Sequence, residues 1–166
     1  GDAGLGVAFE GGPLGLGLRV DGDDARLRLA LRDRDRGLGR TRELDSLRLG
    51  LRLGDRLRVA FDVPEVLLAR PFPLLLLQPL VENAITHGIE PKVGGGEVRI
   101  AAVLADGRLR LAVSDTGAGL REGDAGTGFG LENVRGRLHA LFGEAARLDV
   151  RSNAGRGVVA TVEIPA

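Results

Sequence analysis

Residues 78–88 read QPLVENAITHG, and this stretch decides the fold that the rest of the chain is expected to support. Asn83 stands in the middle of it, although asparagine is a mediocre helix former because its side chain competes with the backbone for hydrogen bonds. The surrounding apolar residues recur at the spacing of a helix with one buried face: Leu77, Leu80, Val81, Ala84 and Ile85. We therefore expect an amphipathic helix in which Asn83 either makes a structural hydrogen bond or has a function.

Two glycine-rich segments lie downstream of this helix. Residues 115–120 read DTGAGL directly after a predicted strand, and residues 126–131 read GTGFGL directly before a predicted helix. Standing alone, D-x-G-x-G is usually only a turn, and the second segment would be only a flexible linker. Residues 120–125 are too few for a domain linker but suit a short mobile lid over a ligand. Together the two segments favour a function for Asn83.

The order of an asparagine helix, a D-x-G-x-G segment and a G-x-G-x-G segment resembles the N box and the two glycine boxes of the GHKL ATPases. Within that superfamily, PLLLLQPLVENAITHGIEP at residues 73–91 looks most like the catalytic domain of LytS-like sensor histidine kinases. The resemblance extends over roughly residues 43–165. It implies the Bergerat ATP-binding fold, an α/β (α+β) two-layer sandwich in which a mixed, largely antiparallel sheet packs on helices.

The resemblance implies that Asp115 accepts a hydrogen bond from the exocyclic amine of adenine, a role that guanine would not satisfy at that atom. Gly117 and Gly119 would let the backbone turn close to the base, where a Cβ would clash. The second glycine segment would face the phosphates of ATP with N–H groups and the positive end of the following helix. Its candidate binding residues are Gly126, Thr127, Gly128, Gly130 and Leu131.

The resemblance also makes Asn83 the expected ligand of Mg²⁺, because its hard amide oxygen suits an ion held mainly by water and phosphate oxygens. His87, one turn further along the helix, matches an aromatic or histidine position of the family and would hydrogen-bond a phosphate or the sugar. A merely buried histidine is the alternative for His87. ATP and Mg²⁺ are therefore the expected cofactors.

Three residues depart from the pattern of the family. Pro79 occupies the place of the water-activating glutamate of related ATPases, and Glu82, beside Asn83 but about 100° around the helix, is not expected to replace it. Thr86 stands where a phosphate-binding Lys or Arg is common. Val158 replaces a threonine hydroxyl that would support Asp115 through water. We expect no catalytic side chain in this chain and poor hydrolysis, with nucleotide binding retained.

Composition excludes several other classes of function. Acidic and basic residues number 23 each, so no excess of positive charge recommends nucleic acid or an anionic membrane as a partner. The absence of cysteine excludes disulfides, thiolate nucleophiles and cysteine metal sites. No apolar run approaches the ~18 residues of a membrane span, and no signal peptide is recognisable. Without an initiator Met, the chain looks like a fragment, which we expect to be cytoplasmic within a parent that can be membrane-anchored.

The predicted elements divide the chain after residue 40. Residues 1–40 are rich in Gly, Leu and Arg, and alternation within 14–20 and 26–32 predicts a β-hairpin around the turn at 21–24. The function of this segment is not indicated by its sequence. Residues 41–166 form the predicted ATP-binding catalytic domain, which begins with a helix at 41–53.

Further elements of that domain follow from hydrophobic periodicity. The expected strands are 57–63, 97–105, 108–114, 148–151 and 158–164, and a second amphipathic helix covers 131–142. Hairpins mixed with helices favour a two-layer sandwich over a parallel Rossmann sheet. The first glycine segment does not open a helix within a βαβ unit, so it fits the dinucleotide fingerprint poorly.

We therefore interpret the sequence as the ATP-binding catalytic domain of a two-component sensor histidine kinase. The acceptor motif of the family is missing, so the expected partners are ATP and a histidine on a separate dimerisation domain, and indirectly a response regulator. Two alternatives remain: an ATP-driven clamp of the gyrase or Hsp90 kind, which Pro79 and the short lid disfavour, and a non-catalytic nucleotide sensor. An anti-sigma-factor serine kinase would share the boxes but fits the wording around Asn83 less well.

Overall fold

The computed structural model describes residues 6–8, 17–19, 30–31, 42–43, 56–68, 74–120, 129–153 and 156–166. The chain divides into two compact units, which are residues 1–55 with 64–72 and residues 56–63 with 73–166. These units do not coincide with the boundary expected after residue 40. Where an independently folding domain begins therefore stays a prediction.

The described residues of the first unit form four short strands and a short helix. The strands pair as two antiparallel ladders, β1 (Gly6–Ala8) with β2 (Gly17–Arg19) and β3 (Ala30–Leu31) with β4 (Arg42–Glu43). The helix is α1, Glu65–Leu68.

Two of our expectations concern residues of this unit. Within the described residues, β2 pairs with β1 and β3 with β4. The turn at 21–24 and most of both arms of the hairpin predicted between 14–20 and 26–32 lie outside the described residues, so that hairpin stays a prediction. Arg42 and Glu43 are in a strand rather than at the start of the helix predicted over 41–53. The remainder of that predicted helix lies outside the described residues.

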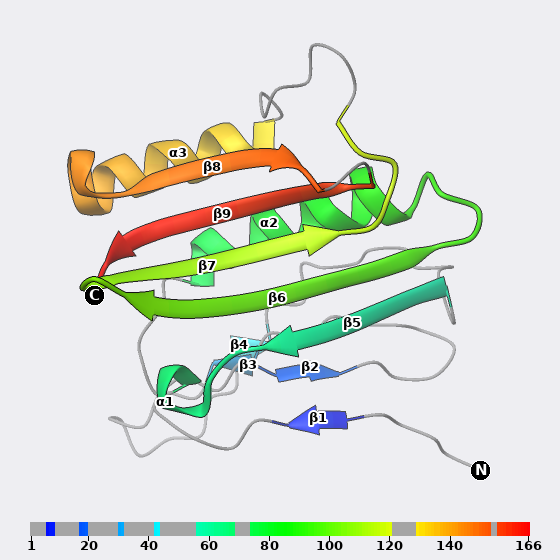
Figure 1. The fold of residues 1–166 in the computed structure, drawn as a ribbon, viewed down its shortest axis with the longest axis horizontal. Helices are drawn as coiled ribbons and strands as arrows, with labels where there is room; N and C mark the ends of the chain where they lie inside the picture. The colour runs from blue at the N-terminus through cyan, green and yellow to red at the C-terminus, as the bar shows by residue number, and fades with distance from the viewer. Residues whose placement is uncertain are drawn as a thin grey trace. The chain divides into compact units, whose positions relative to one another are not determined.

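The second unit is built on a five-stranded sheet whose order is β5-β6-β7-β9-β8 (Figure 1). The parallel pair is β5 with β6, and the other three neighbouring pairs are antiparallel. The sheet is therefore mixed and largely antiparallel, as predicted. Its strands are β5 (Leu57–Asp62), β6 (Gly96–Ala105), β7 (Arg108–Asp115), β8 (Arg147–Ser152) and β9 (Val158–Pro165).

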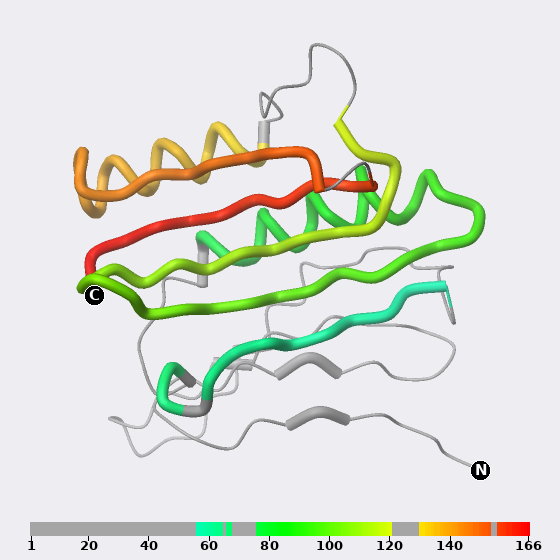
Figure 2. The backbone as a smooth tube through the Cα atoms, in the orientation of Figure 1, coloured from blue at the N-terminus to red at the C-terminus, as the bar shows by residue number. Residues whose placement is uncertain are grey.

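The connections of the sheet follow from strand direction and turn chemistry, and Figure 2 follows the backbone through them. A parallel pair needs a long crossover, and the helical segment between β5 and β6 supplies it. The antiparallel β6 and β7 are joined at Asp106 and Gly107, whose φ angles of 53° and 69° match the tight turn that a D-G pair favours. The predicted D-G hairpin is confirmed.

Helices cover one face of this sheet (Figure 1). They are α2 (Leu74–Asn83), its continuation η2 (Ala84–Ile89) and α3 (Phe129–Phe142), which a short 3-10 turn, η3 (Gly143–Ala145), follows. Helix α2 packs against α3, η2 contacts β6 and β7, and α3 contacts β8. The two-layer α/β arrangement that the sequence predicted is confirmed.

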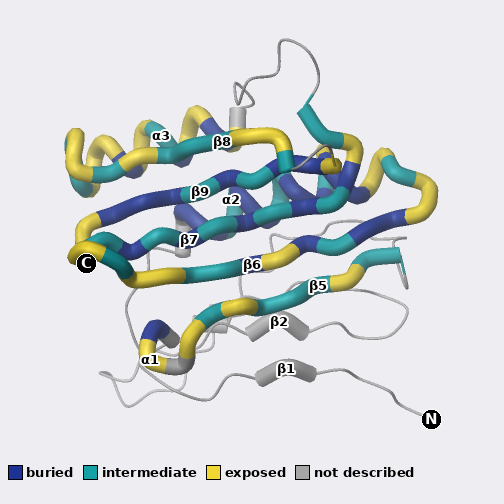
Figure 3. Tube along the Cα trace, viewed as in Figure 1, coloured by how far each residue is buried: buried dark blue, intermediate teal, exposed yellow. Residues whose placement is uncertain are grey.

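The core lies between the helices and the sheet. Strand β7 buries every second residue, and β9 buries Val158, Ala160, Val162 and Ile164 in the same way (Figure 3). This alternation is the signature of a sheet with one face in the core. The largest fully buried side chains are Leu76, Leu80, Ile85, Ile89, Val98, Val113, Val134, Leu138 and Val162. Near the end of α3, Leu141 is 59% exposed, whereas Leu138 is buried and Phe142 is half-buried.

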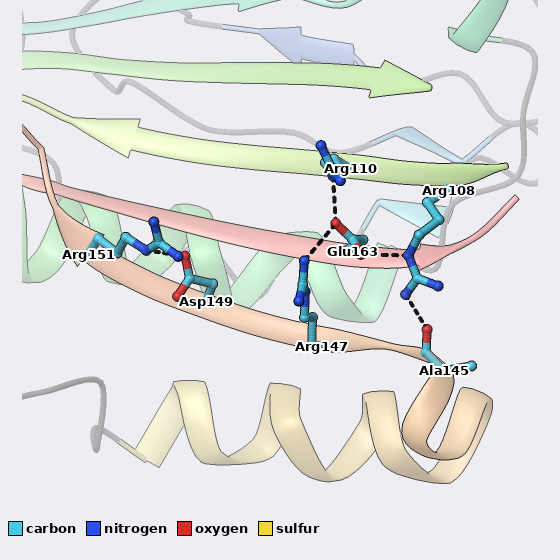
Figure 4. Close-up of polar contacts among 7 residues, drawn as sticks. All are labelled: Arg108, Arg110, Ala145, Arg147, Asp149, Arg151 and Glu163. Carbon is cyan, nitrogen blue, oxygen red and sulfur yellow. Dashed lines mark hydrogen bonds and ion pairs between the residues drawn. The ribbon is translucent and has the colours of Figure 1, made fainter. Parts of the chain in front are cut away.

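The opposite face of the sheet carries ion pairs at its β7, β9 and β8 strands (Figure 4). Glu163 is only 5% exposed and accepts hydrogen bonds from Arg108 and Arg110, each at 2.5 Å, while Arg147 lies 3.3 Å away. The Arg110 hydrogen bond is the main reason that the pKa of Glu163 falls to about 2, and the other arginines act in the same direction. This carboxylate thus links three strands.

Candidate functional site

The helix around Asn83 widens directly after that residue. Helix α2 contains Pro79, which has no backbone N–H to donate. After Asn83, the last residue of α2, the chain continues as the π-helix η2. The Glu90 N–H bonds to the Ile85 carbonyl at 2.9 Å, which spans the five residues of a π-turn. Such turns are rare and occur frequently at functional sites. The sequence predicted a helix here but not its widening.

Asn83 is half-buried at the junction of the two helical segments, and its side chain does not cap η2. The π-helix buries Ala84, Ile85, Gly88 and Ile89. His87 is exposed, so the alternative of a merely buried histidine is wrong. The binding roles of Asn83 and His87 stay predictions.

Asp115 is the last residue of the central strand β7. It lies at the end of the sheet where the carboxyl end of the helical segment α2–η2 also lies (Figure 1). Its side chain points to the core face and the residue is 2% exposed. The Gly117 N–H donates to Oδ1 at 2.8 Å, the Val158 backbone also donates to the carboxylate, and the Asn153 side-chain amide donates to the Asp115 carbonyl at 3.0 Å. Asp115 is therefore a buried acceptor held by its neighbours on both sides.

The pKa of Asp115 is raised above its usual value because burial disfavours the charged form. Three smaller effects oppose this rise: hydrogen bonds from the backbone of Gly117 and of Val158, and the positive charge of Lys92. A carboxylate has about four lone-pair positions, so these two backbone donors leave acceptor capacity for another group.

Glycine backbone packs closely around Asp115, at positions where a Cβ would not fit. A Cβ on Gly88 would stand 2.5 Å from Oδ1 of Asp115, and a Cβ on Gly117 would overlap the backbone of Gly88. Gly157 has a φ of +76°, and its Cβ would meet the Asp115 carbonyl. The Ala118 N–H bonds to the Gly88 carbonyl at 2.9 Å. The π-helix, the end of β7 and the start of β9 therefore meet at backbone distance.

Lys92 is a neighbour of this site that the sequence interpretation missed. Its ammonium donates to the Thr116 carbonyl at 2.8 Å, and the Thr116 hydroxyl accepts a hydrogen bond from the Glu97 N–H at 3.0 Å. Asn153, which directly follows β8, was also missed, because it belongs to no motif that the sequence analysis used. Lys92 is the only lysine of the chain, a singularity that was visible in the sequence but had no place in a known motif.

The second glycine segment is described only from its last residues onward. Gly126, Thr127 and Gly128 lie outside the described residues, as does the predicted lid from residue 121, so the phosphate-binding role stays a prediction. Gly130 lies exposed in the first turn of α3, while Leu131 is 3% exposed and belongs to the core. In the first segment, Gly119 has a φ of +83°, which favours glycine.

No ready-made metal site occurs in the described part of the chain, where no three or more His, Cys, Asp or Glu side chains cluster suitably for an ion. A metal there would need ligands from a bound molecule in addition to side chains such as Asn83. None of the described helices is both long and apolar enough to cross a bilayer.

Comparison with known proteins identifies the family of this domain. Residues 70–166, more than half of the chain, match the family of histidine kinase-, DNA gyrase B- and HSP90-like ATPases. The sensor histidine kinase YpdA of Escherichia coli is 41% identical over 106 residues, covering 58% of this chain and 19% of the relative. The sensor histidine kinase YesM of Bacillus subtilis is 35% identical over 118 residues, covering 69% of this chain and 20% of that relative. The chain thus spans about a fifth of these relatives.

The fold comparison agrees with the sequence comparison. The histidine kinase domain from the blue-light activated histidine kinase of Erythrobacter litoralis superposes with a TM-score of 0.54 at 24% identity, covering 66% of this chain and 52% of that one. At this identity the likeness establishes the fold alone. Taken with the family match, it means that the chain belongs to the histidine kinase-, DNA gyrase B- and HSP90-like ATPases and carries an ATP-binding domain of the type found in sensor histidine kinases.

Proposed function

We propose that this chain binds Mg·ATP and positions it for phosphoryl transfer to a histidine on a separate dimerisation domain of its parent kinase. The observation that carries the proposal is the buried Asp115 carboxylate, which retains acceptor capacity beside backbone that carries no Cβ. Such a site suits a flat, neutral ring with an amino group.

The donor pattern around Asp115 supports adenine as that ring. An ionised carboxylate only accepts hydrogen bonds, so it pairs with the exocyclic amine of adenine and leaves the corresponding carbonyl of guanine without a donor. Leaving a buried polar group unpaired costs about 1–3 kcal/mol, which is enough for strong discrimination. ATP and ADP should therefore bind, and GTP should bind much more weakly.

Asn83 would hold the divalent ion through its amide oxygen, together with water and phosphate oxygens. The amide is a hard ligand of the kind that Mg²⁺ accepts, and the half-buried side chain caps no helix end. When bound, the ion would neutralise charge on the transferred phosphoryl group. Gly126, Thr127 and Gly128 would complete the phosphate contacts, and His87 would reach a phosphate or the sugar.

Among the described residues, the place of the water-activating glutamate of related ATPases offers water no general base. Pro79 has no titratable side chain, and the Glu82 carboxylate accepts a hydrogen bond from the Gln78 amide at 3.1 Å. Without a positioned base, attack by water gains little from the site. An acceptor imidazole brings its own nucleophilic nitrogen and needs only to be held in line. We therefore favour transfer to histidine over hydrolysis, with a response regulator as the subsequent acceptor and the cytoplasm as the compartment.

Calorimetry with ATP, ADP and GTP tests the nucleotide assignment. Asp115→Ala removes one good hydrogen bond to a charged group, worth about 1.5–3 kcal/mol, so ATP should bind about tenfold or more weakly. Equal affinity of the unaltered chain for ATP and GTP would contradict the assignment.

A radiolabelled γ-phosphate then distinguishes the kinase from its alternatives. The label should stay in ATP when the chain is alone and appear on a cognate dimerisation domain when that domain is added, as an acid-labile, base-stable product. Asp115→Ala should abolish this transfer. Efficient hydrolysis that no acceptor changes would instead indicate a clamp ATPase, and tight binding with no transfer would indicate a nucleotide sensor.

A further inference from the structure

Lys92 is fixed at both its backbone and its side chain. It lies in the loop after η2, where its N–H bonds to the Ile89 carbonyl at 3.0 Å and its carbonyl accepts from the Gly95 N–H at 2.8 Å. The half-buried side chain spans 24 residues of sequence to donate to the Thr116 carbonyl at 2.8 Å. Both anchors hold the ammonium at one place beside the end of β7.

Thr116 is the residue between the adenine-binding candidate Asp115 and its hydrogen-bond donor Gly117. On the side of β6, the Thr116 N–H bonds to the Glu97 carbonyl and the Thr116 hydroxyl accepts from the Glu97 N–H, both at 3.0 Å. Lys92 holds the remaining polar group of the Thr116 backbone. The turn that leaves β7 is therefore held by β6 and by Lys92 together.

We propose that Lys92 is a positioning residue that determines base specificity, by holding the turn at the Thr116 carbonyl and thereby fixing a positive charge at the residue that follows Asp115. The inference rests on the proposed nucleotide function and deepens it. Lys92 needs no contact with the nucleotide for this role, because it acts through the orientation and charge state of Asp115.

The electrostatic part follows from the surroundings of Asp115. Burial raises the pKa of this carboxyl, and the Lys92 charge acts against that rise together with the two backbone N–H donors. The other ionisable groups on the adjoining segments are placed differently. His87 of η2 and Arg156 before β9 are exposed, and Glu97 of β6 pairs with Arg99 at 3.2 Å. Among the described residues, Lys92 is thus the charged group that acts on Asp115.

Loss of that charge would change which base the site accepts. An ionised Asp115 accepts from the adenine amine, whereas a protonated Asp115 carries an O–H that can donate to the guanine carbonyl. Without Lys92, the protonated form should persist to higher pH. Adenine selectivity should then weaken first at mildly acidic pH.

The test combines three Lys92 variants with two measurements on this chain. Lys92→Ala removes charge and donor, Lys92→Gln keeps a donor without charge, and Lys92→Arg keeps both. Nuclear magnetic resonance gives the pKa of the Asp115 carboxyl in nucleotide-free protein, and calorimetry gives ATP and GTP affinity between about pH 4 and pH 8. Arg99→Ala is the matched control, because it removes one positive charge paired with Glu97.

We expect Lys92→Ala to raise the pKa of Asp115, to shift the acidic limit of ATP binding to higher pH and to weaken ATP about threefold to tenfold at neutral pH. Lys92→Arg should restore the pH profile, Lys92→Gln should restore only affinity at neutral pH, and Arg99→Ala should change neither. If Lys92→Ala does not fold, the contrast between Lys92→Arg and Lys92→Gln decides in the same way.

Two further outcomes separate this inference from the proposed function. If the unaltered chain binds ATP selectively but all Lys92 variants share its pH profile and Asp115 pKa, the inference is wrong and the proposed function stands. If the unaltered chain does not bind ATP, the proposed function fails, and with it the specificity role of Lys92, whatever the pKa of Asp115 does.

Discussion

Gly88 of the π-helix lies so close to Asp115 of β7 that a Cβ on residue 88 would stand 2.5 Å from the carboxylate oxygen Oδ1. The approach is possible because the helix turns its backbone, not a side chain, toward the end of the strand. A carboxylate that would otherwise be covered by a side chain thus keeps acceptor capacity for a ligand.

We predict that Gly88→Ala weakens ATP binding and destabilises the fold. The added methyl group must displace the Asp115 carboxylate, and overpacking of this kind costs about 1–3 kcal/mol. Thermal unfolding and calorimetry with ATP measure the two effects. Gly136→Ala is the control: this exposed glycine of α3 has nothing within 4 Å of an added Cβ, so the substitution should stabilise by up to ~1 kcal/mol and leave ATP affinity unchanged. Equal behaviour of the two variants would contradict the close packing.

Asp115→Asn should make the protein more stable than the unaltered chain at neutral pH, with the difference vanishing in acid. The pKa of Asp115 in the folded protein is raised above its usual 3.8. The protonated carboxyl therefore adds to the free energy of unfolding below pH 3.8, and this stabilisation is lost as pH rises through the folded pKa. Asparagine carries no charge to bury and has no such dependence. Denaturant unfolding of both proteins across pH measures the difference. A difference that is independent of pH would show that Asp115 is not a buried ionising group.

Asn83→Ala should abolish the enhancement of ATP binding by Mg²⁺ while leaving the fold intact. The side chain makes no hydrogen bond that caps η2, so its loss should remove the proposed metal ligand without leaving a backbone group of that helix end unpaired. Calorimetry with Mg²⁺ and with EDTA measures the effect, and Gln78→Ala on the same helix is the control. If Asn83→Ala unfolds and the unaltered chain binds ATP equally in EDTA, then Asn83 is a structural residue.

Glu163→Gln should lower stability at neutral pH but not in strong acid. The pKa of Glu163 in the folded protein is about 2, below the usual 4.5. The ionised carboxylate therefore adds to the free energy of unfolding above pH 4.5, and this stabilisation is lost as pH falls through about 2. The difference in melting temperature between the two proteins should therefore shrink as pH falls. Asp149→Asn is the control, because its pair with Arg151 is largely exposed and should contribute little. A Glu163 effect no larger than that of Asp149 would mean that the three arginines do not act as a unit.

Local patterns in the sequence determined most of the second unit. The apolar stripe around Asn83 predicted its helix, the Asp106–Gly107 pair predicted the β6–β7 hairpin, and alternation placed Asp115 at the end of a strand. These features depend on residues a few positions apart, whose backbone preferences are the same in any fold. The hairpin predicted over residues 14–32 lies largely outside the described residues, and the glycines of its first arm specify strand register only weakly.

Only the tertiary structure decided what surrounds Asp115. Its neighbours are 27, 23 and 42 residues away in the sequence: Gly88, Lys92 and Gly157. They come close because the crossover before β6 and the register of β7 with β9 bring their segments to the same end of the sheet. No periodicity encodes such contacts, since each depends on how two elements pack rather than on the preference of either one. The sequence by itself thus identified the carboxylate as a candidate, and packing decided its burial and the backbone groups that surround it.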